Sequence, residues 1–60
     1  MQGHWVIKDI DTDEVITIND EWKTRTDVED FLDGMKGQHN IISDYWMIGN
    51  RKVYVDYEWR

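Results

Sequence analysis

The chain has no cysteine, and this absence excludes disulfides and thiolate metal sites as sources of stability. It also lacks an apolar run of about 18 residues, so no segment is expected to span a membrane. Its first residues, Met1 to Trp5, lack the basic and apolar regions of a signal peptide. The expected location is therefore cytoplasmic.

Basic residues are scarce, with 7 Lys and Arg against 13 Asp and Glu, which gives a net charge of −6. Binding to a phosphate backbone needs clustered Lys and Arg, so the sequence argues against a nucleic-acid binder. The acidic surplus favours a basic protein partner, and the alternative is that it serves only solubility.

With 60 residues, the chain is expected to form one small domain over residues 1–60. A chain of this length buries only about 60% of the surface that its unfolded form exposes, so its core must be dense. Four Trp, three Tyr and one Phe supply large apolar side chains for that core.

One helix is predicted, over residues 26–37. Apolar side chains recur there at the i, i+3, i+4 and i+7 spacing of one helical stripe. These are Val28, Phe31, Leu32 and Met35. Thr26 and Glu29 have the spacing of a capping box, and Gly37 is expected to end the helix in a left-handed conformation.

Four strands are predicted, over residues 4–10, 15–19, 41–48 and 52–59, because these segments are rich in β-branched and aromatic residues. An even-length connection between the first two strands predicts that Ile7 lies opposite Ile18. The residues then expected on the core face of these two strands are Trp5, Ile7, Ile16 and Ile18.

This order of elements predicts an α+β fold, a single ββαββ domain. Its four-stranded mixed sheet would have the order 2-1-4-3, with the first and last strands central and parallel. One helix would cover one face through a right-handed crossover. In element order and length the chain resembles ubiquitin-like domains and the immunoglobulin-binding domains of streptococcal protein G, which implies a β-grasp-like fold. It shares no motif with either, so the resemblance implies no function and no binding residue.

No set of residues predicts catalysis, a metal site or a cofactor. His4 and His39 lie in different predicted elements, and no Ser or Thr has a nearby His-Asp arrangement. The acidic run that begins at Asp9 has the spacing of a calcium loop at its start. However, Glu14 stands where that loop needs glycine, and Asp20 stands where it needs glutamate. A turn rich in Asp is the better interpretation.

The first candidate binding surface is the acidic face of the predicted helix. It comprises Asp27, Glu29, Asp30 and Asp33. One interpretation is a solvated face, and the other is a docking face for a basic partner. In its most specific form, the carboxylates would imitate the phosphates of DNA.

The second candidate is the sheet face that the helix leaves open. Its residues are Val6, Ile10, Tyr45, Met47 and Tyr54. They are interpreted either as cross-strand pairs that support the sheet or as an interface with a partner or a second copy.

Asp44 conflicts with the pattern, because strand parity places it on the core face between Ile42 and Trp46. A buried carboxylate without a partner is costly, so a bulge that turns Asp44 outward and Ile41 inward is expected.

Together these features predict a non-enzymatic protein-binding module. It would be a small acidic cytoplasmic protein that occupies a surface of a larger partner, which is basic or itself binds nucleic acid. A phage-type inhibitor or DNA mimic is the specific form of this hypothesis. The alternative is a self-associating structural domain that forms a homodimer through the open sheet face.

Overall fold

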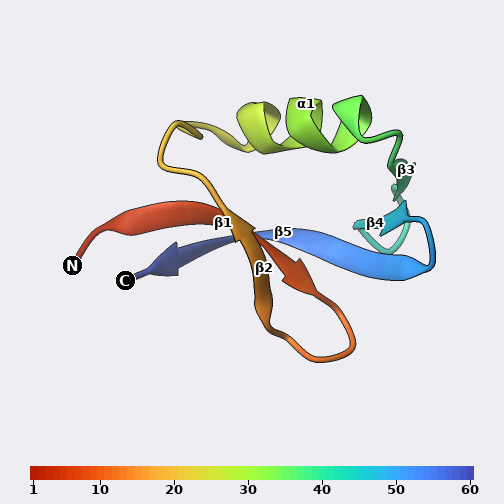
Figure 1. Cartoon of the computed structure of the whole chain (residues 1–60), viewed down its shortest axis with the longest axis horizontal. Coiled ribbons are helices and arrows are strands. Elements are labelled where there is room, and N and C mark those ends of the chain that lie inside the picture. Colours follow the sequence, from red (N-terminus) through yellow and green to blue (C-terminus); the bar gives the residue numbers. More distant parts are fainter.

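A computed structural model describes residues 1–60 and has one helix lying across one side of a five-stranded sheet (Figure 1). The elements are β1 (Gly3–Asp9), β2 (Val15–Ile18), α1 (Arg25–Gly34), β3 (Gln38–Asn40), β4 (Tyr45–Ile48) and β5 (Arg51–Trp59). The predicted α+β class is confirmed, but the sheet has five strands instead of four and the order β2-β1-β5-β4-β3.

The central strand β5 pairs antiparallel with β1, from Gly3 opposite Trp59 to Asp9 opposite Val53. The pairing continues beyond the strands, because Gln2 and Arg60 exchange two backbone hydrogen bonds of 2.9 and 2.8 Å. The two ends of the chain therefore lie side by side (Figure 1). All strand pairs are antiparallel, so the predicted mixed sheet with a parallel central pair is wrong.

The cause is a turn inside the segment 41–48 that was predicted to be one strand. The structure divides this region into β3, a turn over residues 41–44, and β4. Each hairpin reverses the chain direction, so one additional reversal makes the last strand antiparallel to the first. A β-grasp-like arrangement, which depended on the parallel central pair, is not confirmed.

The N-cap of the helix lies two residues earlier than the sequence pattern indicated. Thr24 is the N-cap, and its hydroxyl accepts a hydrogen bond from the backbone N–H of Asp27, whose carboxylate accepts one from the N–H of Thr24 in return. This is a complete capping box, so the predicted box of Thr26 and Glu29 is wrong. Both pairs have the same spacing, and the pattern alone does not choose between them.

The helix ends near Met35, and Lys36 adopts the left-handed conformation with φ of 61° that was predicted for Gly37. Gly37 is needed for a different reason. A Cβ atom there would lie 3.0 Å from the carbonyl oxygen of Leu32 and 3.1 Å from the ring of Trp46. The absent side chain lets the chain leave the helix close to the core.

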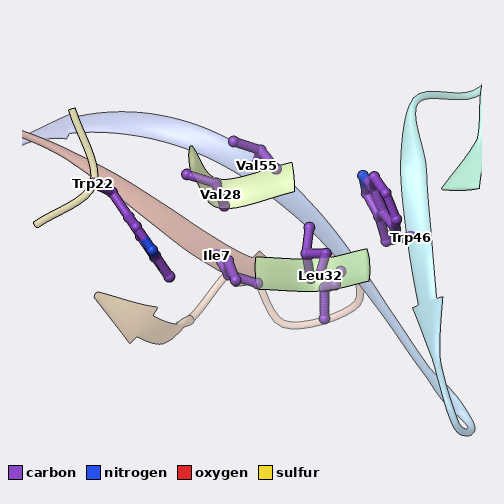
Figure 2. Close-up of a cluster of buried hydrophobic side chains, with 7 residues drawn as sticks. Ile7, Trp22, Val28, Leu32, Trp46 and Val55 are labelled. Atoms are coloured by element: carbon purple, nitrogen blue, oxygen red, sulfur yellow. The ribbon is translucent and has the colours of Figure 1, made fainter. Parts of the chain in front are cut away.

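The core lies between α1 and the central strands. It consists of Ile7, Trp22, Val28, Leu32, Trp46, Val53 and Val55. Trp22 and Trp46 lie at opposite ends of this cluster (Figure 2). The predicted apolar stripe of the helix is only partly buried, because Phe31 and Met35 remain 37% and 48% exposed.

The β1–β2 hairpin has a register different from the predicted one. Val6 lies opposite Ile18 and Ile7 opposite Thr17, and a bulge then leaves Ile16 without a partner before Lys8 pairs with Val15. The predicted pairing of Ile7 with Ile18 is therefore wrong. Because of this shift, Ile16 and Ile18 are exposed instead of joining the core.

The turn between β1 and β2, residues 10–13, is called here the first turn. One carboxylate oxygen of Asp9, at the end of β1, accepts the backbone N–H groups of Asp11 and Thr12 at 2.8 and 3.2 Å. The other oxygen lies 3.2 Å from Nε of Arg51. Asp9 is buried, and its hydrogen bonds and its contact with Arg51 support the turn. At the end of the turn, Asp13 adopts a left-handed conformation with φ of 62°.

Candidate functional site

The acidic face of the helix is smaller than its four acidic residues suggested. The carboxylate of Asp27 accepts the backbone N–H groups of Lys23 and Thr24 at 2.8 and 3.0 Å. These two hydrogen bonds, that from Lys23 first, lower the pKa of Asp27. Asp27 therefore serves the N-terminus of the helix, where a negative charge is favourable.

The other three acidic residues of the helix differ in their contacts. Glu29 lies 3.5 Å from Nε of Arg25, one turn earlier on the same helix. Asp30 and Asp33 are exposed, and neither forms an ion pair or a side-chain hydrogen bond. Of the predicted acidic docking face, these two carboxylates remain unengaged.

The turn between β3 and β4, residues 41–44, is called here the second turn. The side-chain oxygen of Asn40 accepts the backbone N–H groups of Ile42 and Ser43, each at 3.1 Å. This closes the turn with both isoleucines on its outside, where Ile41 is 81% exposed and Ile42 is 96% exposed. The expectation that Ile41 turns inward is therefore wrong.

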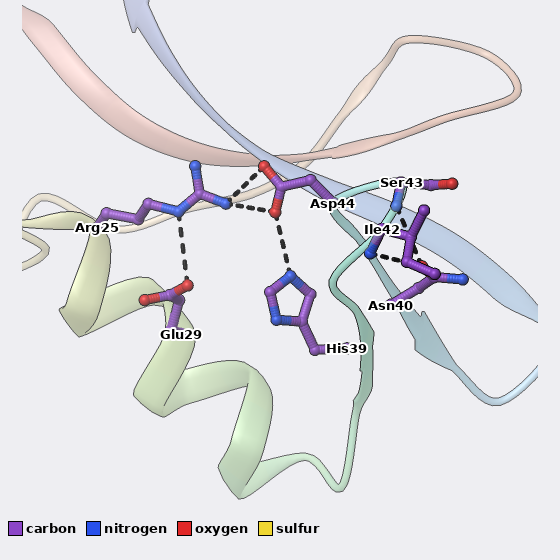
Figure 3. Close-up of polar contacts among 7 residues, drawn as sticks. All are labelled: Arg25, Glu29, His39, Asn40, Ile42, Ser43 and Asp44. Atoms are coloured by element: carbon purple, nitrogen blue, oxygen red, sulfur yellow. Dashed lines mark hydrogen bonds and ion pairs between the residues drawn. The ribbon is translucent and has the colours of Figure 1, made fainter.

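Asp44 is turned outward, as expected, but by this turn with φ of 53° and not by a bulge within a strand. Its two carboxylate oxygens accept hydrogen bonds from Nη2 of Arg25 at 2.8 and 3.0 Å (Figure 3). Nε2 of His39 lies 3.1 Å from one of the same oxygens. The second turn is thereby attached to the start of α1.

The electrostatic effect on this cluster is mutual. His39 and then Arg25, through their hydrogen bonds, hold the pKa of Asp44 below its usual 3.8, and Asp44 raises the pKa of Arg25. The imidazole of His39 also stacks on the buried indole of Trp46, with ring centroids 4.5 Å apart and an interplanar angle of 5°. The second turn therefore has one polar and one aromatic attachment to the body of the protein.

The open sheet face has charged side chains at its centre. Nζ of Lys8 lies 3.1 Å from Asp56 and 2.9 Å from Glu58, and their hydrogen bonds, that of Glu58 first, raise the pKa of Lys8. Val6, predicted to be exposed, is fully buried. The face is therefore less apolar than the sequence pattern indicated.

The remaining residues predicted on this face fall into two groups. Ile10 belongs to the first turn, and Tyr54 contacts that turn because its hydroxyl donates a hydrogen bond to Asp13. Tyr45 and Met47 lie on β4, beside the second turn, and Nζ of Lys52 lies 5.4 Å from the centre of the Tyr45 ring. The structure does not bring all five residues together in one patch.

A shallow hollow of about 460 Å³ is present where β3, the second turn and β4 meet. Its apolar lining consists of Ile41, Ile42, Tyr45 and Met47, which together are called the turn surface. Gln38, His39 and Asn40 supply polar groups at its margin.

Ile42 was missed as a candidate, because a β-branched pair favours a strand. The sequence did contain a signal for the turn. Asn40 precedes the pair, and Ser43 and Asp44 follow it, and all three residue types favour turns.

No group of three or more His, Cys, Asp or Glu side chains is placed to hold a metal ion. The single helix is neither long enough nor apolar enough to cross a membrane. Comparisons with protein-family models, with curated proteins and with solved structures found no significant match to this chain.

Proposed function

We propose that the chain is a non-enzymatic protein-binding module that occupies a surface of a larger partner through the turn surface. The observation that carries the proposal is the exposure of two adjacent isoleucines, 81% for Ile41 and 96% for Ile42. Full burial of one such side chain is worth about 1.5–3 kcal/mol. Within this chain neither isoleucine gains that stabilisation, whereas a partner that covers them would supply it.

The attachments of the second turn also support binding. Asn40 closes the turn, and Arg25 and His39 hold Asp44 at its end. The isoleucines are thus presented on a backbone that is already ordered. Preorganisation of this kind lowers the entropy lost when a surface associates.

The hollow beside the isoleucines adds a complementary shape, because a partner could insert a side chain between Met47 and the second turn. With a net charge of −6, a basic partner is favoured. The unengaged carboxylates of Asp30 and Asp33 are available to it, which keeps the phage-type inhibitor or DNA mimic as a form of this proposal. A cytoplasmic site of action is part of the same proposal.

The first test combines quantitative affinity capture with two matched variants. Ile42→Asp and Trp59→Asp both replace an exposed apolar residue by Asp, but only the first lies on the turn surface. We expect a partner captured by the unaltered chain to be retained by Trp59→Asp and lost by Ile42→Asp. Equal retention by both variants contradicts the assigned surface.

The charge of the partner is tested separately by Asp30→Asn and Asp33→Asn, which leave the helix cap unchanged. We expect these variants to bind the captured partner with lower affinity than the unaltered chain does. We also expect added salt to lower the affinity further. Insensitivity to both changes would exclude a basic partner and the DNA-mimic form.

Sedimentation equilibrium across protein and salt concentrations tests the alternative, a homodimer through the open sheet face. We expect a monomer, because the ion-paired Lys8 lies at the centre of that face. A salt-resistant dimer that Tyr45→Lys dissociates would replace the proposal.

A further inference from the structure

A second apolar hollow lies between the end of α1 and the sheet, and Ile16 and Thr17 of the edge strand β2 form part of its lining. It has a volume of about 140 Å³, and six of its eight lining residues are hydrophobic. At its rim lie Ile16, Phe31, Met35 and Ile48, and its floor is formed by the buried Ile7 and Val53. This hollow and the adjacent edge of β2 are called here the β2 groove.

The groove follows from two departures from the expected packing. The bulge leaves Ile16 outside the regular ladder, and both Ile16 and its neighbour Thr17 line the hollow. On the helix, Gly34 lies three residues after Phe31 on the same flank. A Cβ atom at Gly34 would meet nothing within 4 Å, so this flank is open. The hollow therefore reaches the edge strand β2 through Ile16 and Thr17.

The two edges of the sheet differ in chemistry. The β3 edge, Gln38–Asn40, is polar, whereas the β2 edge is Val-Ile-Thr-Ile and contains no charge. An edge strand presents unpaired N–H and C=O groups that an added strand can pair with, and charged side chains are a common protection against such pairing. Because of the bulge at Ile16, only a short part of this edge is regular. A side chain of the added strand that enters the hollow must therefore supply much of the binding specificity.

Acidic residues flank β2 in the sequence, and two of them have contacts within the chain, Asp20 with Nδ1 of His4 at 3.2 Å and Asp13 with the hydroxyl of Tyr54. Asp13 and Glu14 directly precede β2, and Asp20 and Glu21 follow it. Asp30 lies beside Phe31 on the exposed side of the helix. The one cation in the lining, Arg51, is engaged by Asp9 at 3.2 Å. An occupant with positive charge before and after its central residues is therefore favoured.

The same charges argue against a second copy of this chain as the occupant. An antiparallel copy would place Asp13 and Glu14 against Asp20 and Glu21 of the other molecule. A parallel copy would place each acidic pair against its own equivalent. Both arrangements are repulsive, whereas a basic segment is attracted at both ends.

We propose that the β2 groove binds an extended basic segment of a partner protein, which adds a strand to β2 and places one apolar side chain in the hollow. This contact is separate from the turn surface and does not depend on it. A chain with both contacts could hold a partner at two sides of the helix.

The test uses the full chain labelled with ¹⁵N and a synthetic peptide of alternating valine and threonine with two lysines at each end. We expect the peptide to slow hydrogen exchange at the amide of Ile18, which faces the open edge because the adjacent Thr17 is directed toward Ile7 of β1, and to shift the resonances around Met35. The same peptide with a central proline cannot complete the strand ladder, so we expect it to give no protection.

Two variants separate this contact from the turn surface. Met35→Lys fills the hollow with a cation at an exposed position, and we expect it to weaken peptide binding by about tenfold or more. Ile42→Asp is the control, and we expect it to leave peptide binding unchanged.

Four results would overturn the proposal. They are the absence of peptide binding, binding without protection of β2, equal binding of the proline peptide, and protection that rises with protein concentration without peptide. The last result would identify a second copy as the occupant. Because the peptide reports on the groove alone, none of these results affects the proposal for the turn surface.

Discussion

The first and second turns are built in the same way but present different side chains to solvent. In each turn, the side-chain oxygen of the preceding residue, Asp9 or Asn40, accepts backbone N–H groups two and three residues further along the chain. In each, the fourth residue after it is an aspartate with a positive φ, Asp13 or Asp44. Each turn is also attached to the body of the protein by an arginine, Arg51 or Arg25.

The difference lies in the side chains that these similar backbones carry. The position of Ile42 in the second turn corresponds to Asp11 in the first, since each lies two residues after the capping side chain. A charged residue is therefore compatible with this backbone geometry. Ile42 is not required for the turn to form, so its exposure calls for an explanation outside the fold, and a partner contact supplies one.

The largest effect is expected from removal of the two capping side chains. Asp9→Ala should lower the free energy of unfolding by about 1–3 kcal/mol, because it leaves two partly buried backbone donors and the guanidinium of Arg51 unpaired. Asn40→Ala should cost about 0.5–1.5 kcal/mol, because water can reach the more exposed second turn. Urea unfolding with an unchanged m-value measures both. Equal costs would contradict the assignment of the first turn as the more buried one.

Acid should loosen the second turn through Asp44. Its pKa is lowered in the folded state, so its contribution to stability is complete above the ordinary value of 3.8 and is lost as the pH falls through the lower folded value. Amide exchange at Ile42 and Ser43 should accelerate over that range. Asp44→Asn should abolish this pH dependence, whereas Asp11→Asn, at an exposed position without a side-chain partner, should retain it. An unchanged profile in Asp44→Asn would exclude Asp44 as the responsible group.

Alkali should act on the first turn instead. The hydrogen bond to Asp13 is the main cause that raises the pKa of Tyr54 above 10.0. The contribution of this phenol is therefore complete below pH 10.0 and is lost as the pH rises through its folded pKa. Absorbance titration of the unaltered chain and of the Tyr54→Phe variant measures this pKa, because the difference between the two titration curves is the ionisation of Tyr54. A Tyr54 that ionises at its ordinary pKa would show that the contact with Asp13 is absent in solution.

The smallest effect on stability is expected from an exchange of surface residues between the turns. Ile42→Asp and Asp11→Ile should each change the free energy of unfolding by no more than about 0.5 kcal/mol, because both positions are exposed. Thermal unfolding monitored by circular dichroism measures this change. A large loss of stability in Ile42→Asp would show that the isoleucine supports the turn itself.

The sequence predicted those features that depend on local periodicity. The helix and its buried residues Val28 and Leu32 follow from the spacing of apolar side chains. The start of the helix did not follow, because Thr24 with Asp27 and Thr26 with Glu29 satisfy the same capping pattern. Only the path of the preceding segment, with Trp22 buried at the end of the core, distinguishes them.

The sheet topology and the turn surface depend on residues whose preferences for strand and turn conflict. In the segment 41–48, the β-branched isoleucines favour a strand and the flanking Asn40 and Asp44 favour a turn. The hydrogen bonds of Asn40 and the ion pair of Asp44 with Arg25 decide this in favour of the turn. Arg25 is distant in the sequence, so its contribution is not visible in a local pattern. The bulge at Ile16 is equally a property of the paired strands, and it could not be predicted from β2 alone.

The backbone pairing of Gln2 with Arg60 has a consequence for engineering. Because the two termini are already aligned by hydrogen bonds of 2.8 and 2.9 Å, a short peptide linker could close the backbone into a ring with little distortion. For a ring of this size the chain-entropy model gives a stabilisation of roughly 4 kcal/mol, through restriction of the unfolded ensemble. The ring could then be reopened at the β4–β5 connection, where Gly49 and Asn50 are exposed, to give a circular permutant with both hairpin turns intact.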